Sequence, residues 1–313
     1  MNTLEGKAWQ AMAATKGLGA KGLWRIAEYL RLQGRTASWL LRNPGKARDV
    51  LGSAVDLGWS GAAALDAEID EMEREIIVLH PLHPAFPRRI RDRREALPLP
   101  ALLYAAGSLP LLESPSVAVV GRRDSASAAL AAAGELAARL AEASAAVVSG
   151  HAAGTDAAAH AGALRVGGTT IAVPAEGLGR FRARPELRGL MTDANTLLLS
   201  PFPPQAAWAA FQAMARNKVV AALADAMVVI GSGVERDAGG RMSGTFDAAL
   251  AALKLGIPLF TAVPSSFSPA PAGNAELLRR GAIAWEPQQG AAPILEAIRQ
   301  AARKQGPEQR KLF

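Results

Sequence analysis

The chain of 313 residues has no cysteine, which excludes disulfide bonds, thiolate zinc sites and cysteine nucleophiles. Aromatic residues are scarce, at 5% of the chain, so its alanine-rich helices are expected to be slim and closely packed. No apolar run is long enough to span a membrane, and the first residues lack the basic-then-apolar pattern of a secretory signal. The sequence therefore predicts a cytoplasmic protein with no membrane partner.

Positive charge is what the chain has in surplus. Its 35 lysines and arginines exceed its 28 aspartates and glutamates, which leaves a net charge of +7. Such a surplus favours an anionic partner such as a nucleic acid, a nucleotide or a lipid surface. The length allows one large domain and a smaller one, and a hydrophobic content of 50% is ordinary for a soluble fold.

Short amphipathic helices are predicted over residues 1–75. In residues 20–33 the apolar side chains recur on one helical face, at Leu23, Ile26, Ala27 and Leu30. The turn Gly17-Leu18-Gly19 between two such helices is similar to the hairpin of helix-hairpin-helix units, whose backbone amides meet a DNA phosphate. An ordinary tight helix–helix turn is the alternative. We expect an all-α domain that resembles a SAM or helix-hairpin-helix domain.

The next segment, residues 76–116, is rich in proline, which prevents long helices and favours extended or turn structure. We therefore expect a connector here, with a domain boundary within it. His80 and His83 lie between prolines without acidic neighbours, so a metal site is not expected at this pair.

Strands and helices alternate from residue 117 to residue 287. The predicted strands are apolar runs at 117–121, 145–150, 169–174, 197–202, 226–231 and 257–263. Continuous apolar runs are expected where both faces of a sheet are covered, and repeated strand–helix units imply a parallel, doubly wound sheet. The predicted fold class is α/β, an extended Rossmann-like, mostly parallel sheet over 117–287, followed by a basic C-terminal helix and tail over 288–313.

Glycine-rich turns follow several of these strands, at the edge of the sheet where ligands bind in this fold. The predicted site residues are Gly121, Arg122, Arg123 and Ser125 in the first turn, Ser149, Gly150, His151, Gly154, Thr155 and Asp156 in the second, and Ser243, Gly244 and Thr245 at a later helix start. Such turns let the backbone approach an anion, and the first amides of the next helix point at it. One such turn is what any α/β fold needs, but three with arginines and hydroxyl groups predict a phosphate-binding groove.

A basic segment, Arg216-Asn217-Lys218, lies within the helix predicted over 205–224. It either adds contacts to the same anion or belongs to a solvated helix face. Trp208 and Phe211 on this helix either stack on bases or pack in the core. We assign the basic segment to the predicted binding site.

Chemistry beyond binding is not predicted. Asp156 and His160 are four residues apart and able to pair on one helix face, but Asp156 also suits a first helical turn, where a carboxylate complements the dipole. A metal site of these two residues with His151 is disfavoured, because ligands on a first turn would splay apart. Ser149 lacks the G-x-S-x-G elbow of a nucleophile, and its turn departs from the dinucleotide fingerprint G-x-G-x-x-G. We expect no enzyme activity, no metal and no cofactor.

Several segments, in order along the chain, resemble the DNA-processing protein A (DprA/Smf) family. They are PALLYAAGSLPLLESPSVAVVGRR, VVSGHAAGTDAAAHAGAL, GGTTIAVPAEGL, LLLSPFPP, FQAMARNKVVAALAD and AGNAELLRRGA. The resemblance implies an extended Rossmann domain that binds single-stranded DNA in a basic pocket, forms a homodimer and loads the RecA recombinase. It also implies a role in DNA recombination and in the transformation of competent cells, without catalysis.

The family's site residues carry over to matching positions of this chain. Gly121 and Arg123 match its glycine and its phosphate-contacting arginine, and residues 216–218 match its R-N-R segment. The other matches are Ser149, Gly150, Gly154 and Asp156 in its second glycine turn, and Ser243 and Thr245 at its serine-rich helix start.

The chain departs from the family at several positions. Ala153 stands where the family has an arginine, Pro201 stands where it has a glutamate, and VERDAGGR is an insertion after the strand at 226–231. His151 occupies a position that is usually apolar, and the 28 residues after Trp285 are too few for the winged helix of many members. Because one phosphate contact is missing, we expect a divergent member with altered affinity for its ligand.

The chain ends in Q-x-x-L-F, a pattern that resembles the peptide by which bacterial proteins dock on the replicative sliding clamp. The prediction is a clamp contact through Gln309, Leu312 and Phe313. A frayed basic terminus is the alternative.

A second interpretation of the fold is a nucleotide-binding sensor or a phosphoribohydrolase-like enzyme. The stretch Gly244-Thr245-Phe246-Asp247 is similar to the G-T-x-E of such hydrolases, with Asp247 in the acid position. Their full P-G-G-x-G-T-x-x-E is absent, so we favour the interpretation as a single-stranded DNA-binding protein.

Overall fold

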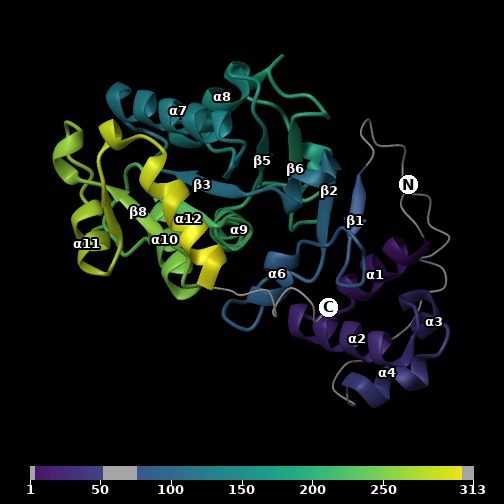
Figure 1. Cartoon of the computed structure of the whole chain (residues 1–313). Coiled ribbons are helices and arrows are strands. Elements are labelled where there is room, and N and C mark those ends of the chain that lie inside the picture. The colour runs from purple at the N-terminus through teal and green to yellow at the C-terminus, as the bar shows by residue number, and fades with distance from the viewer. Residues whose placement is uncertain (1–3, 52–75, 305–313) are drawn as a thin grey trace.

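The computed structural model describes residues 4–51 and 76–304 of the chain. It shows a cluster of helices near the N-terminus beside a larger body built around one sheet (Figure 1). Within these described residues, no helix combines the length and the apolar character that crossing a membrane requires.

Among the described residues, the N-terminal region consists of α1 (Leu4–Ala14), α2 (Ala20–Gln33), α3 (Ala37–Leu41) and α4 (Pro44–Leu51). The predicted apolar face of α2 is buried. Glu5 ties α1 to the start of α3 by accepting hydrogen bonds from the backbone amides of Ala37 (2.8 Å) and Ser38 (3.0 Å). In the turn before α2, Gly17 has a φ of +84° and Leu18 is buried. The likeness of this turn to a DNA-binding hairpin stays a prediction.

The sheet has nine strands among the described residues, in the order β1-β2-β6-β5-β4-β3-β7-β8-β9. Their bounds are β1 (Ile77–Leu79), β2 (Leu103–Gly107), β3 (Ser116–Val120), β4 (Ala146–Ser149), β5 (Thr170–Ala172), β6 (Thr196–Ser200), β7 (Ala226–Val229), β8 (Leu259–Ala262) and β9 (Ile283–Trp285). β2 pairs antiparallel with both of its neighbours, and every other pair is parallel. The predicted α/β fold with a mostly parallel sheet is confirmed.

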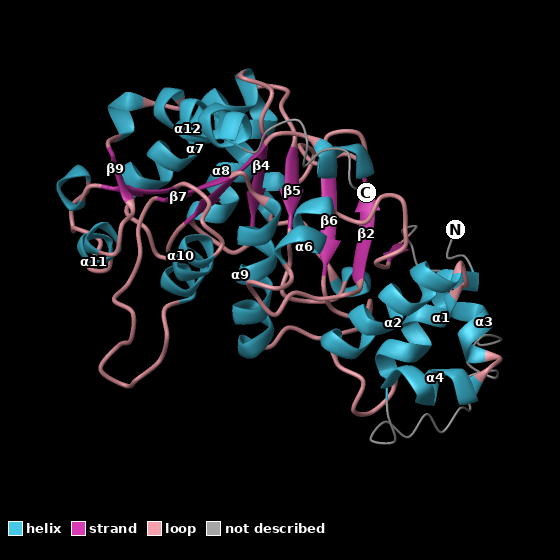
Figure 2. Ribbon diagram, turned by 60° about the horizontal axis from the view of Figure 1, so that its bottom comes forward, coloured by secondary structure: helices cyan, strands magenta, loops and turns pink. Residues whose placement is uncertain are grey.

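Helices cover both faces of the sheet (Figures 1 and 2). One face carries α7 (Ser127–Glu142), α8 (Thr155–Arg165) and α12 (Ala292–Lys304), and the other carries α6 (Arg88–Arg93), α9 (Ala210–Leu223), α10 (Gly244–Lys254) and α11 (Asn274–Arg279). The side chains of β3 alternate between these layers, because Val117 and Val119 pack with α7 while Ala118 and Val120 pack with α9 and α10. A Cβ on Gly162 of α8 would collide with the backbone of α7, so these two helices pack as closely as their small residues predict.

The N-terminal helices pack on the β1–β2 end of the sheet. Trp9 of α1 is fully buried and stacks on His80, with the ring centroids 5.3 Å apart. Burial lowers the pKa of His80 to about 4, so this histidine is neutral at pH 7 and acts as a packing residue.

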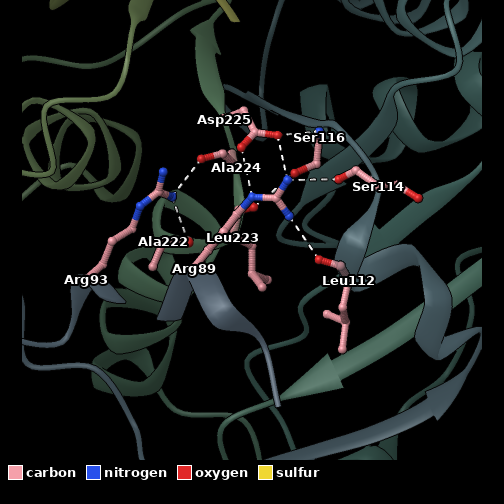
Figure 3. Close-up of polar contacts among 9 residues, drawn as sticks. All are labelled: Arg89, Arg93, Leu112, Ser114, Ser116, Ala222, Leu223, Ala224 and Asp225. Atoms are coloured by element: carbon pink, nitrogen blue, oxygen red, sulfur yellow. Dashed lines mark hydrogen bonds and ion pairs between the residues drawn. The ribbon is translucent and has the colours of Figure 1, made fainter. Parts of the chain in front are cut away.

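The segment 76–116, predicted as a connector, differs from that expectation because it supplies β1, β2 and α6 to the folded body. Proline is compatible with short strands near a sheet edge, and the apolar residues between the prolines pair with β6. Arg89 of α6 donates to both carboxylate oxygens of Asp225 (2.8 and 2.7 Å) and to the carbonyls of Leu112 and Ser114 (Figure 3). We call Arg89, Arg93 and Asp225 the arginine clamp.

The second arginine of the clamp holds the end of a helix. Nη1 of Arg93 donates to the carbonyls of Ala222 (2.8 Å) and Ala224 (2.7 Å), where α9 ends (Figure 3). A cation here satisfies carbonyls that lack intrahelical partners and complements the negative end of the helix dipole. The clamp therefore joins the predicted connector to the core of the sheet domain.

Candidate functional site

The predicted turns meet where the winding of the sheet reverses. From β3 the chain winds through β4 and β5 to β6 and then returns to β7 on the other side of β3, which is the place where parallel sheets of this kind bind ligands. A hollow of about 670 Å³, which we call the cleft, lies there. The predicted site residues that line it are Gly121, Arg122, Arg123, Gly150, Asp156, Arg216, Asn217, Ser243, Gly244 and Thr245.

Four other predicted residues hold the turns in place rather than facing the cleft. Ser149 is fully buried, and its hydroxyl donates to the carbonyl of Val119 at 2.7 Å. Thr155 Oγ1 lies 3.2 Å from the Arg122 carbonyl and 3.0 Å from the Ser125 hydroxyl. Gly154 has a φ of +76°, and a Cβ there would collide with the backbone of Arg122 and Arg123. These contacts fix the first two turns against each other.

Hydrogen bonds across the cleft fix its other walls. The Asn217 amide of α9 donates to the Gly244 carbonyl (2.8 Å), and the Thr245 hydroxyl donates to the Gly121 carbonyl (3.0 Å). Ser243 caps α10 by accepting a hydrogen bond from the amide of Phe246. Lys218 does not line the cleft. It lies near Asp247, whose pKa is raised by burial, while the positive charge of Lys218 acts in the opposite direction.

Arg216 and Asp156 form a buried pair at the floor of the cleft. Their side chains are 6% and 8% exposed, and Arg216 Nη1 lies 3.9 Å from Asp156 Oδ2. Burial raises the pKa of the Asp156 carboxyl, while Arg216 and the Ala152 amide act in the opposite direction. Arg216 fits only because residue 150 is glycine, since a Cβ on Gly150 would overlap the guanidinium. The Nε of Arg216 is buried and has no hydrogen-bond acceptor in the part of the chain that the structure describes.

Arg123 and Trp208 stand at the mouth of the cleft. Arg122 is paired with Asp124 at 2.6 Å, whereas Arg123 is exposed and, within the described residues, has no carboxylate within 4.0 Å. Its guanidinium lies 5.8 Å from the centre of the Trp208 ring, and Trp208 is 53% exposed. Trp208 precedes α9, which begins at Ala210 rather than at the predicted residue 205. The pair thus offers a guanidinium that has no carboxylate partner within the described residues, beside an aromatic ring that is about half exposed.

His151 of the second turn and His160 of α8 are packing residues. His151 has a φ of +57°, its ring contacts Phe181 at a centroid distance of 4.7 Å, and burial lowers its pKa to about 4. His160 is fully buried, and its Nδ1 lies 2.6 Å from the hydroxyl of Thr170, which itself donates to Val147. Nδ1 must therefore carry the proton. His160 contacts Thr170 rather than Asp156, so the pairing allowed by the helical spacing is not formed.

A second cavity of about 460 Å³ adjoins the cleft and is lined by arginines. We call it the arginine pocket; its basic residues are Arg123, Arg182, Arg184, Arg188 and Arg216. Three of them come from the loop between β5 and β6, which the sequence prediction left out of the site. The signal was the crowding of arginines in GRFRARPELRG, but loop residues carry no periodicity that indicates which way they face.

The insertion after β7 forms one wall of the cleft through Val234, Asp237 and Arg241, and Met242 directly after it lines the same wall. Asp237 holds this loop by accepting hydrogen bonds from the amides of Gly239 (2.8 Å) and Arg241 (3.0 Å). Asp247, the acid of the hydrolase-like alternative, lines neither cavity. Within the described residues, no group of three His, Asp or Glu side chains is placed to hold a metal ion.

Curated relatives of this chain are DNA-processing proteins. It is 36% identical over 140 residues to DNA processing protein DprA of Streptococcus pneumoniae, and 38% identical over 187 residues to a putative DprA of Mycobacterium tuberculosis. These matches cover 44% and 58% of this chain and 49% and 46% of the relatives. The chain thus spans about half the length of the curated relatives it matches.

Solved structures give the same likeness over more of the chain. The X-ray structure of DprA from S. pneumoniae has a TM-score of 0.72 at 25% identity and covers 94% of this chain and 98% of that one. A DprA structure from Helicobacter pylori, described for its single-stranded DNA binding mode, has a TM-score of 0.58 at 25% identity. It covers 72% of this chain and 98% of that one.

The family model of DNA recombination-mediator protein A matches residues 77–298. This range contains the whole sheet, the cleft and the arginine pocket. The chain belongs to the DNA recombination-mediator protein A family.

Proposed function

We propose that this protein binds single-stranded DNA in the cleft and acts as a non-enzymatic recombination mediator. The observation that carries the proposal is the pair at the mouth of the cleft, where Arg123 has no carboxylate partner among the described residues and Trp208 is half exposed. The single-stranded DNA binding of the H. pylori relative supports it.

Single strands are favoured over duplexes because of the aromatic residues. Trp208 lines the cleft and is 53% exposed. Phe211 lies on α9, the helix that lines the cleft, and is 74% exposed. A base stacks on such a ring only when its face is free, and in a duplex the neighbouring bases cover it. The arginines supply contacts to the phosphates that do not depend on sequence.

The proposed DNA-contacting residues are the predicted ones that line the two cavities, with Trp208 added. Ser125, Ser149, Gly154 and Thr155 act by holding the turns, and Lys218 stays a predicted contact. Loading of the RecA recombinase, a homodimer, a role in transformation and a cytoplasmic location follow from the family and are part of the proposal. The sliding-clamp contact through Gln309, Leu312 and Phe313 lies outside the described residues and stays a prediction.

Fluorescence anisotropy with labelled single- and double-stranded oligonucleotides at two salt concentrations tests this function. We expect tighter binding of the single strand, weakening as salt rises because counterions compete for the phosphates. Arg123→Ala and Trp208→Ala should each weaken binding about tenfold, since a phosphate contact and a stacked base are each worth roughly 1–3 kcal/mol. Arg165→Ala, an exposed arginine at the end of α8, is the matched control.

Two results would contradict the proposal. One is equal affinity for single and double strands. The other is wild-type affinity in both Arg123→Ala and Trp208→Ala. Release of free base from nucleoside monophosphates would instead favour the hydrolase-like alternative.

A further inference from the structure

The arginine pocket holds more positive charge than a DNA backbone contact needs. Five guanidinium groups line a cavity of about 460 Å³, and Glu176 is the carboxylate among its lining residues. The Asp156 carboxylate, whose Oδ2 lies 3.9 Å from Arg216 Nη1, balances the charge of Arg216. Five guanidiniums less these two carboxylates leave three positive charges facing one small volume. Glu186 of the same loop is exposed and does not line the pocket.

The pocket is built into the fold. Arg184 Nε donates to the carbonyl of His151 at 2.9 Å, which ties the β5–β6 loop to the turn after β4. Arg182 Nη1 donates to the carbonyl of its neighbour Phe181 (2.9 Å), and the Phe181 ring packs on His151. At the floor, the side chain of Arg216 is buried, and its Nε has no acceptor among the described residues. The loop thus has a fixed place, while most guanidinium donors of the pocket have no hydrogen-bond acceptor within residues 4–51 and 76–304.

The charge and shape of the pocket indicate which anion it fits. An internal phosphodiester carries one negative charge and continues in both directions along the strand. A terminal phosphate monoester carries about −1.5 to −2 at pH 7 and ends the chain. Three net positive charges around this cavity match the second ion better than the first, since planar guanidiniums contact several of its oxygens at once.

The pocket is also continuous with the cleft. Arg123, Gly150, Ala152, Trp208 and Arg216 line both cavities. A strand lying in the cleft therefore reaches the pocket without leaving the protein surface, and Trp208 at the junction offers a ring for the last base. We infer that the arginine pocket binds the terminal phosphate monoester of a DNA strand held in the cleft. This inference rests on the proposed function.

The test compares oligonucleotides of one sequence that differ only at their ends. One carries a 5′-phosphate, one a 3′-phosphate and one hydroxyl groups at both ends, and a circular single strand has no end. We expect one phosphorylated end to raise affinity about tenfold over the hydroxyl form, because hydrogen bonds between guanidinium groups and a phosphate are charge-assisted and therefore stronger than neutral ones. The double variant Arg182→Gln/Arg188→Gln should lose this preference.

Arg180→Gln is the matched control, because Arg180 lies in the same loop, is exposed and does not line the pocket. It should keep the end preference, while the double variant should keep binding to the circular strand. Equal affinity for all ends, or a preference that survives in the double variant, overturns the inference even if single strands still bind. Absence of single-strand binding in the wild-type protein overturns the proposed function first.

Competition separates the strand end from a free anion. Inorganic phosphate and a nucleoside monophosphate at matched ionic strength should compete only weakly with a phosphorylated strand, because they lack contacts in the cleft. If either removes the end preference at micromolar concentration, the pocket is a site for a free phosphate ligand and the strand-end assignment is wrong.

Discussion

Arg89 and Arg123 are both arginines of the same domain, yet they differ in how many hydrogen-bond acceptors the protein offers them. Arg89 donates to two oxygens of Asp225 and to two backbone carbonyls (Figure 3). Arg123 has a ring contact to Trp208 and, among the described residues, no carboxylate within 4.0 Å. The first guanidinium has its acceptors inside the protein, and the second faces a hollow.

This difference separates arginines whose donors are used inside the protein from arginines that we propose to contact a ligand. A guanidinium has five N–H donors and no acceptor. The donors that make no hydrogen bond to a protein oxygen are therefore the ones that a ligand can use. Arg93 of the clamp donates to two carbonyls at a helix end, whereas Arg188 of the pocket makes one long bond of 3.5 Å to Ala183. Counting basic residues along the sequence does not make this distinction.

Breaking the clamp should give the largest effect. Arg89→Met leaves Asp225, whose side chain is 23% exposed, without its cation and removes two carbonyl contacts. We expect a loss of about 3 kcal/mol in the free energy of unfolding, as for other largely buried pairs with one partner removed. Urea denaturation measures it. Single-strand affinity of the folded protein should stay unchanged, and a tenfold loss would place Arg89 in the binding site.

Gly150→Ala tests Arg216, which is buried like the arginines of the clamp and also lines the cleft like Arg123. The new Cβ would overlap the guanidinium, and overpacking of this kind costs about 1–3 kcal/mol. The free energy of unfolding should fall by that amount and DNA affinity should fall with it. In an Arg216→Ala background the same change should cost much less. Additive costs in the double-mutant cycle would mean that the two residues do not interact.

Arg123→Met makes the same substitution in the cleft. It should lower single-strand affinity and leave stability nearly unchanged, the opposite of Arg89→Met. The free energy of unfolding should change by less than about 0.5 kcal/mol, as expected for an exposed side chain without partners. Single-strand affinity should fall about tenfold, which is 1.4 kcal/mol, and the slope of log affinity against log salt should shrink by about one contact. A stability loss as large as that of Arg89→Met would erase the distinction between the two regions.

The smallest effect concerns the histidines under each region, His80 beneath the N-terminal helices and His151 beneath the pocket. Their folded pKa values, lowered by burial to about 4, lie below the unfolded value of 6.5. The unfolded chain therefore binds more protons below pH 6.5, and stability is complete above that pH and declines as pH falls toward 4. Between pH 7 and pH 6 each histidine should cost about 0.7 kcal/mol.

Denaturation at several pH values measures this decline. His151→Asn should reduce this decline by the share of one histidine, and the fold should tolerate the change because asparagine accepts the positive φ of residue 151. An unchanged pH profile in that variant would show that His151 is not held neutral by the fold.

Much of the fold followed from the sequence because its strands are strongly patterned. Apolar runs such as that at 117–121 predicted both the strand and its place between two helix layers, and the glycines after it predicted the cleft. Ser149 and Thr155 are in the predicted turns, but their hydroxyls bond to the protein itself. Burial of this kind depends on neighbours that are distant in sequence, which spacing does not reveal.

The arginine pocket was missed for a related reason. Its loop is fixed by the bond from Arg184 to the His151 carbonyl and by Phe181, contacts between segments about 30 residues apart in the chain. Composition showed the arginines of this loop, but only the folded chain shows that they meet Arg123 and Arg216. Ala153 stands where we expected an arginine of the family. In this chain the β5–β6 loop supplies three arginines close to that turn.

The position of Trp208 gives the protein an optical reporter of its own. Trp9 and Trp285 are fully buried, and among the described tryptophans Trp208 alone is more than half exposed. Among the described tryptophans, its emission is therefore the one that a water-soluble quencher reaches most easily, and a base stacked on the ring would shield it. Binding of unlabelled strands, with either kind of end, should therefore be measurable as protection of the Trp208 fluorescence from that quencher.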